Sequence, residues 1–180
     1  MDPDRRLTLT PYVLRFTFYE SPRMSTISDE LIDTIDFLIH RYRLHMRLPV
    51  DISPLLDRFE IRKHNFTPMT MGYTLVRPKQ LYMGINKNLD FGWQRMAHAH
   101  EAAHIIAKQS QPLFVCKTNG WSRDPDEREA QLIAACLLVP LRVVAENYRV
   151  GIAHELARAL KVPADLVDLR WSFARVHGDI

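Results

Sequence analysis

Two histidines and a glutamate stand close together at His100-Glu101-Ala102-Ala103-His104. On an α-helix, residues four apart lie one above the other on the same face. His100 and His104 can therefore converge on one zinc ion, and Glu101 can reach a water molecule beside that ion. The spacing predicts a zinc hydrolase in which the two histidines are metal ligands and Glu101 is the general base.

The bare pattern also fits a polar helix face with two solvated histidines, because a chain with eight histidines can contain it by chance. A catalytic zinc needs three protein ligands and an open position. The longer pattern with a further Gly and His is absent, since Ala107 and Ser110 occupy those positions. A glutamate on a second helix is the common alternative, and Glu127 and Glu129 are the candidates.

Helical geometry separates these two glutamates. The segment that follows them has an apolar face centred near Ala130, Ala134 and Leu137. At about 100° per residue, Glu127 lies about 50–60° from that centre and Glu129 about 100° away. Glu127 is therefore better aimed at a neighbouring helix. Glu129 remains the alternative ligand, and otherwise we expect it to be solvated or to support a ligand through a hydrogen bond.

The elements around these motifs predict an α+β fold. We expect a helix that Ser28 caps and that runs to about Met46, then a short helix at 52–59. Three strand-like runs follow, at 60–66, 69–76 and 80–85, and their short connections favour an antiparallel sheet. The motif helix is expected at 91–108, a loop at 109–122, a second motif helix at 124–140 and two further helices at 152–160 and 164–176.

This pattern predicts three regions: an N-terminal extension over 1–27, a zincin-like domain over 28–140, and a helical, helix-turn-helix-like lobe over 141–180. The lobe carries nearly equal numbers of basic and acidic side chains, which makes direct DNA binding by it less favourable than packing or partner docking.

The bulk composition is that of a globular protein. Hydrophobic residues make up 47% of the 180 residues and charged residues 25%, and the net charge of +3 is too small to indicate nucleic-acid binding. No run of about 18 apolar residues predicts a membrane span. Two cysteines predict no disulfide framework, so we expect a protein of the cytoplasm.

The two motifs together resemble those of the ImmA/IrrE family of bacterial and phage zinc peptidases, which show H-E-x-G-H followed by E-x-x-A-N-x-F-A-A-x-L-L-M-P. The second pattern is similar to residues 127–140 of this chain. The resemblance implies that Glu127 is the third zinc ligand, with Mn²⁺ a possible substitute for Zn²⁺ in the cell. Four positions depart from the pattern, namely Ala103, Gln131, Ile133 and Val139. None of them removes a ligand or the base.

The resemblance also implies a function. Relatives act on helix-turn-helix repressors in phage, mobile-element or stress-response switches, so a repressor is the implied substrate. We expect a zinc-dependent metallo-endopeptidase in which Glu101 moves the proton. A non-catalytic regulatory protein that binds a repressor or DNA is the alternative, and a small-molecule zinc hydrolase is a third possibility.

Other residues near the predicted site have less certain roles. An extended substrate is expected to add to an exposed strand edge, for which Gln80–Asn86 is the candidate. Tyr73, Tyr82 and His64 are candidates for stabilising the oxyanion. His98 is expected on the surface or packed, since two residues turn it about 200° from His100. We expect no ligand role for Cys136, and Cys116 falls in the predicted loop.

Overall fold

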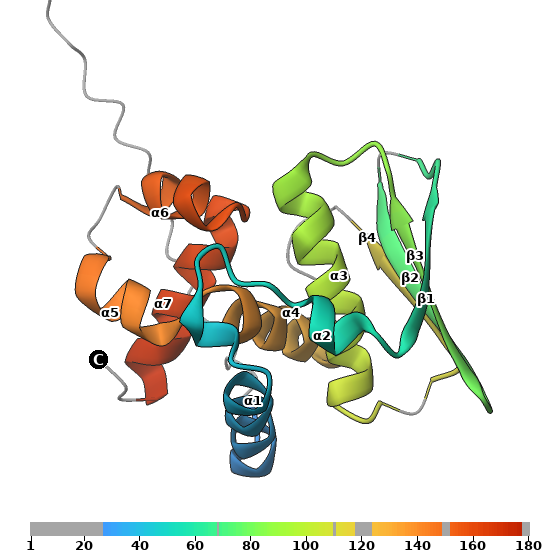
Figure 1. Cartoon of the computed structure of the whole chain (residues 1–180), viewed down its shortest axis with the longest axis horizontal. Helices are drawn as coiled ribbons and strands as arrows, with labels where there is room; N and C mark the ends of the chain where they lie inside the picture. Colours follow the sequence, from blue (N-terminus) through green and yellow to red (C-terminus); the bar gives the residue numbers. More distant parts are fainter. Residues whose placement is uncertain (1–26, 68, 110, 118–123, 149–151, 178–180) are drawn as a thin grey trace, which may run out of the picture.

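The computed structural model describes residues 27–67, 69–109, 111–117, 124–148 and 152–177. The expected N-terminal extension lies almost wholly outside these residues. Over the described chain, seven α-helices, one short 3-10 helix and four strands confirm the predicted α+β class. The sheet lies at one side of the molecule, helix α3 (Phe91–Ile106) packs on it, and helix α4 (Pro125–Leu138) runs from α3 toward the C-terminal helices (Figure 1).

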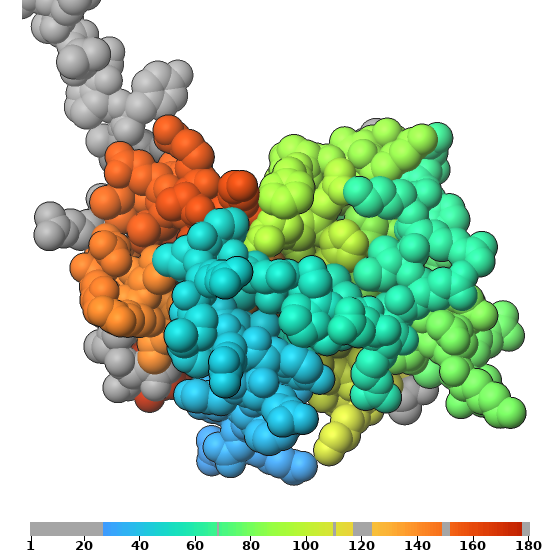
Figure 2. All heavy atoms as spheres, in the orientation of Figure 1, coloured from blue at the N-terminus to red at the C-terminus, as the bar shows by residue number. Residues whose placement is uncertain are grey.

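The N-terminal helix α1 (Asp29–Arg41) begins as predicted, because the Ser28 hydroxyl accepts a hydrogen bond from the Leu31 N–H at 3.3 Å. It ends before Met46, since Arg43 takes a left-handed conformation with φ 53°. The 3-10 helix η1 (Leu44–Met46) and the short α2 (Ser53–Leu56) follow. Figure 2 shows this blue-to-cyan segment lying across one face, between the C-terminal helices and the sheet.

The sheet consists of β1 (Phe59–His64), β2 (Thr70–Arg77), β3 (Gln80–Asn86) and β4 (Leu113–Lys117), in the order β1-β3-β2-β4. Strand β2 is antiparallel to both β3 and β4, as short connections predict, but β1 is parallel to β3. The predicted antiparallel pairing is therefore confirmed for β2 and wrong for β1. The reason is that β3 inserts between β1 and β2, where its buried residues Met83 and Ile85 face α3.

Strand β4 lies in a segment for which the sequence predicted a loop. Its side chains alternate, with Leu113 and Val115 exposed and Phe114 and Cys116 buried. Among the strands of the described residues, β4 pairs with β2 alone, so β4 is one edge of this sheet and β1 is the other. The candidate substrate edge Gln80–Asn86 is β3, which has a neighbour on each side. That prediction is wrong, since an internal strand has no free backbone groups for a substrate.

The two motif helices begin at aspartate caps. The Asp90 carboxylate accepts a hydrogen bond from the Trp93 N–H, and the Asp124 carboxylate accepts one from the Asp126 N–H, both at 3.0 Å. Pro125 occupies the first turn of α4. Every residue of α4 from Ala130 to Leu138 is buried, so this helix is the centre of the molecule.

The C-terminal lobe contains α5 (Leu141–Asn147), α6 (Ala153–Leu160) and α7 (Ala164–His177), of which the last two match the predicted helices. Helix α7 packs against α4, α5 and α6. The Tyr148 hydroxyl donates a hydrogen bond to Asp168 at 2.8 Å and thereby holds the end of α5 on α7. Among the helices of the described residues, none is long and apolar enough to cross a bilayer.

Candidate metal centre

Helix α3 places His100, Glu101 and His104 in the interior of the protein. All three side chains are fully buried. The Nε2 atoms of His100 and His104 lie 3.2 Å apart, with the two rings nearly perpendicular. This is the arrangement that the four-residue spacing predicted, and it excludes a solvated helix face.

Helix α4 brings Glu127 against the two histidines. One carboxylate oxygen lies 3.1 Å from His100 Nε2 and the other lies 3.6 Å from His104 Nε2. Donor atoms bonded at about 2.0–2.1 Å to one tetrahedral zinc ion are about 3.3–3.4 Å apart. The separations of 3.1–3.6 Å therefore fit a single small metal ion bound by these three residues.

The directions in which the pKa values of His104 and Glu127 shift suit the same purpose. Burial lowers the pKa of His104, and the neighbouring His100 lowers it further. Burial opposes ionisation of Glu127, but the hydrogen bond and charge of His100, together with His104, give a lowered pKa. Neutral imidazole and ionised carboxylate are the forms that bind metal ions.

Gln109, just beyond the end of α3, supports His104. Its amide oxygen lies 2.6 Å from His104 Nδ1, and its amide nitrogen donates to Glu129 at 3.1 Å and to the Asp126 carbonyl at 3.3 Å. If Nδ1 carries the proton, the Nε2 lone pair remains available for a metal. Glu129 thus lies behind His104 as a supporting carboxylate, whereas Glu127 faces both histidines.

His100 lacks an equivalent support among the described residues. Its Nδ1 is buried and makes no hydrogen bond there. Gln131, one of the departures from the family pattern, is buried on α4, and its amide oxygen also lacks a hydrogen bond within the described chain.

The Glu101 carboxylate lies beside the candidate metal centre in an apolar environment. Burial raises the pKa of Glu101 to about 8, and the charge of Glu127 contributes to the rise. The Thr74 hydroxyl and the Cys116 backbone lower this pKa by less. Both carboxylate oxygens are buried, and neither has a hydrogen-bond partner of good geometry in the described chain.

Gly72 on β2 provides the space for Glu101. A Cβ at this position would lie 2.8 Å from the Gly84 carbonyl oxygen and 3.2 Å from Glu101 Oε1. Gly72 was not among the residues predicted for the site. A glycine within a strand pattern signals a close approach of some other group, and that signal was present.

Strand β4 forms one wall of the centre. The Phe114 ring stacks on the His104 ring, with the centroids 4.3 Å apart and the planes at 10°. The Cys116 sulfur lies within 4.8 Å of a ring nitrogen of His100 and of a carboxylate oxygen of Glu127. Neither contact was predicted from the sequence, because residues 109–122 were expected to form a loop. The alternation from Leu113 to Cys116 was the available signal.

The three candidates for stabilising the oxyanion are not brought to the centre. The Tyr73 hydroxyl lies 3.5 Å from His64 Nε2, and the Tyr73 ring covers Gly84. Thr74 instead faces α3 and donates to the Glu101 carbonyl at 3.3 Å, so Tyr73 points from the opposite face of the sheet. Tyr82 lies on that face too, because it alternates with Met83, the partner of Thr74.

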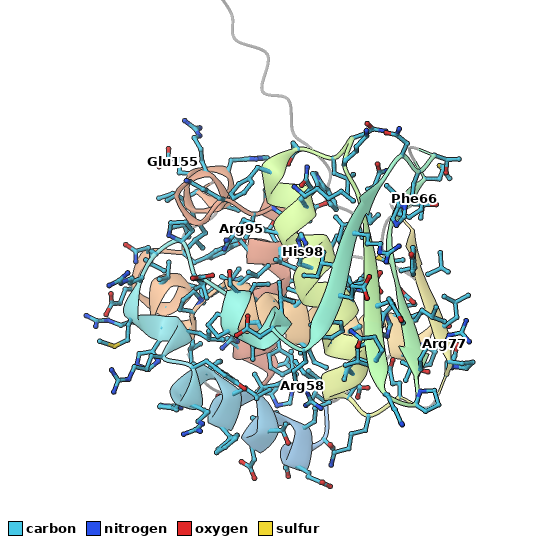
Figure 3. All side chains as sticks on the ribbon, turned by 45° about the vertical axis from the view of Figure 1, so that its right-hand side comes forward. Arg58, Phe66, Arg77, Arg95, His98 and Glu155 are labelled. Carbon is cyan, nitrogen blue, oxygen red and sulfur yellow. The ribbon has the colours of Figure 1, made fainter. Side chains whose placement is uncertain are left out.

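His98 was expected to lie on the surface or to be packed, and the structure shows it packed. It is half-buried on α3, and its Nδ1 lies 2.7 Å from the Gln94 carbonyl oxygen. Figure 3 shows Arg95 and His98 along α3, with Phe66 and Arg77 at opposite ends of the sheet. Cys136 lies on α4, nine residues beyond Glu127.

A family model described as Peptidase_M78, IrrE N-terminal-like domain, matches residues 58–172, which is more than half of the chain. The match includes the sheet, both motif helices and most of the C-terminal lobe. No curated protein and no solved structure matches the chain significantly.

Proposed function

The chain belongs to the IrrE N-terminal-like peptidase family, and from this membership we propose that it is a zinc-dependent metallo-endopeptidase. It hydrolyses a peptide bond within a protein substrate. The observation that carries the proposal is the convergence of His100, His104 and Glu127, whose donor atoms lie 3.1–3.6 Å apart beside a buried carboxylate.

His100, His104 and Glu127 would hold the zinc ion. When bound, zinc supplies a Lewis acid that polarises the scissile carbonyl and lowers the pKa of a water molecule toward 7. Gln109 orients His104 through the hydrogen bond to Nδ1. The buried setting excludes bulk water, which strengthens every electrostatic interaction at the centre.

Glu101 is the proton carrier. Its carboxylate takes a proton from the attacking water and then delivers that proton to the nitrogen of the leaving amine. The position of Glu101 supports this role: it follows His100 directly on α3, and its fully buried side chain lies close enough to Glu127 to feel its charge.

We place the substrate along β4. This strand is an edge of the sheet, and Phe114 and Cys116 join it directly to the candidate centre. A peptide that adds to β4 as a further strand would gain main-chain hydrogen bonds, while the exposed Leu113 and Val115 would contact its side chains.

We further propose that the substrate is a helix-turn-helix repressor in the cytoplasm, for which the family resemblance is the support. The C-terminal lobe packs on α4 through α7. We therefore assign the lobe to stability or to partner docking rather than to DNA binding.

The variant Glu101→Gln tests the proposal. It keeps the shape of the side chain but cannot accept a proton, so metal binding should persist and cleavage of a repressor encoded beside the gene should fall by about 10²–10⁴-fold or more. Metal content is measured by elemental analysis and cleavage by gel electrophoresis. His98→Gln, on the same helix but outside the centre, is the control and should retain both properties.

A chelator should abolish cleavage by the unmodified protein, and added zinc should restore it. Cleavage that continues in Glu101→Gln, or that survives complete removal of the metal, would contradict the proposed mechanism. Purified protein that binds no divalent metal at all would contradict the proposed function itself.

A further inference from the structure

Cys116 lies at the centre and carries a side chain that can bind metal, but the proposed mechanism gives it no chemical role. It is 1% exposed, and its sulfur lies within 4.8 Å of donor atoms of both His100 and Glu127. We propose that the Cys116 thiolate is a fourth protein ligand of the metal, which gives the centre a closed, resting form. This inference rests on the proposed function, because it assumes the same metal ion.

The strand register directs the Cys116 side chain toward the metal centre. Cys116 pairs with Gly72 across β2 and β4, and paired residues point to the same face of a sheet. A Cβ at Gly72 would lie 3.2 Å from Glu101 Oε1, so that face is the one that carries the centre. Phe114, two residues before Cys116, stacks on His104 and shares the face.

The chemistry of the donor set suits zinc. Thiolate sulfur binds zinc at about 2.3 Å, so in a tetrahedral site it lies about 3.5 Å from the nitrogen and oxygen donors. The sulfur lies at most 4.8 Å from the donor atoms of His100 and Glu127, so it must move by about an ångström to bind the same ion as these two residues.

Binding converts the thiol into a thiolate, and its proton passes to solvent. Four protein ligands close a zinc site, whereas catalysis needs one open position. A substrate must therefore displace Cys116 before reaction, and the protein would be held inactive until a peptide on β4 provides the energy for that exchange.

The test uses the full-length protein loaded with Co²⁺ and its absorption spectrum. A cysteine ligand produces an intense thiolate-to-cobalt band in the near ultraviolet, separate from the visible bands that any four-coordinate cobalt site gives. Cys136→Ser contains Cys116 as its sole cysteine. We expect the near-ultraviolet band in the unmodified protein and in Cys136→Ser, and its loss in Cys116→Ser together with a fall in metal affinity of about tenfold or more.

The outcomes separate this inference from the proposed function. If the visible cobalt bands vanish in His100→Ala, the metal centre is present. If Cys136→Ser at the same time shows no near-ultraviolet band, Cys116 is not a ligand of that centre. No cobalt bands in any form would reject both. Because Cys136→Ser is decisive by itself, a folding defect in Cys116→Ser does not prevent a decision.

Closure has its own test. A small peptide hydroxamate, which binds zinc and cobalt through two oxygens, should remove the near-ultraviolet band as it displaces the thiolate. A band that persists after the hydroxamate has shifted the visible bands would show that Cys116 does not occupy the open position, which would overturn the closed form.

Discussion

Gln109 is not a predicted metal ligand, but its hydrogen bond to His104 can decide which ring nitrogen of that histidine carries the proton. Its amide joins the end of α3 to the start of α4, through His104 on one side and Glu129 on the other. The amide oxygen favours a proton on His104 Nδ1, which leaves Nε2 for the metal. Outer partners of this kind fix both the tautomer and the orientation of a metal-binding histidine.

Replacing Gln109 by alanine should therefore weaken metal binding by about 10–100-fold, since His104 would lose its orienting hydrogen bond. The measurement is a titration of zinc against a competing chelator. Gln111→Ala, an exposed residue two positions later, is the control and should bind zinc as the unmodified protein does. Equal zinc affinities of Gln109→Ala and Gln111→Ala would show that Gln109 does not support metal binding.

At the scale of elements, strands β2 and β4 form the wall on which α3 places its functional residues. The register of these strands shifts between Thr70 and Gly72, as in a β-bulge. Bulges often occur next to active sites, where they redirect side chains. The pairing brings Gly72, which has no side chain, opposite Cys116 and next to Glu101, so the strand leaves space for the Glu101 carboxylate.

Gly72→Ala tests whether that space is necessary. The added methyl would lie 2.8 Å from the Gly84 carbonyl oxygen, a backbone atom with little freedom to move. We expect the free energy of unfolding to fall by about 1–3 kcal/mol and cleavage to fall further than stability explains, because Glu101 would be displaced.

The matched control is Gly92→Ala on α3, where a Cβ meets its nearest atoms at 3.4–3.5 Å. Alanine favours a helix over glycine by up to about 1 kcal/mol, so this variant should be neutral or slightly more stable. Chemical denaturation and a cleavage assay on both variants make the comparison. If Gly72→Ala cleaves at the normal rate, Glu101 does not depend on this space.

At the scale of the whole molecule, Arg95 connects three parts of the chain. From α3 its guanidinium donates to the Val50 carbonyl at 2.7 Å and to the Lys161 carbonyl at 3.1 Å. Val50 lies just before α2 and Lys161 at the turn between α6 and α7. The motif helix is thereby tied to the N-terminal segment and to the C-terminal lobe at once.

Arg95→Ala should lower the free energy of unfolding by about 1.5–3 kcal/mol, since hydrogen bonds from a charged donor are lost and two carbonyls lose their partner. Denaturation followed by circular dichroism measures the change. Arg77→Ala, at the exposed end of β2, should stay within about 0.5 kcal/mol (Figure 3). Equal free energies of unfolding for Arg95→Ala and Arg77→Ala would show that the hydrogen bonds of Arg95 do not help to hold the lobe on α3.

The sequence by itself was sufficient to predict the positions of residues that depend on the local geometry of one helix. Four-residue spacing on a helix brings His100 and His104 together whatever surrounds them, and the apolar face of α4 turns Glu127 inward. The start of α4 at Asp124 was also expected from the sequence, whereas Asn88 and Asp90 were both possible caps of α3 and the structure has Asp90. The roles of His100, His104 and Glu127 as metal ligands and of Glu101 as the base stay predictions, which measurements of metal binding and cleavage will test.

The tertiary structure alone decided the order of the strands and everything that depends on it. Insertion of β3 between β1 and β2 made β4 the edge beside the centre, and only then do Phe114, Cys116 and Gly72 meet α3. Such contacts join residues far apart in the chain, and pairings between distant strands leave no periodic signal along it. Spacing within one helix is a property of the sequence, whereas the neighbour of a strand is a property of the folded chain.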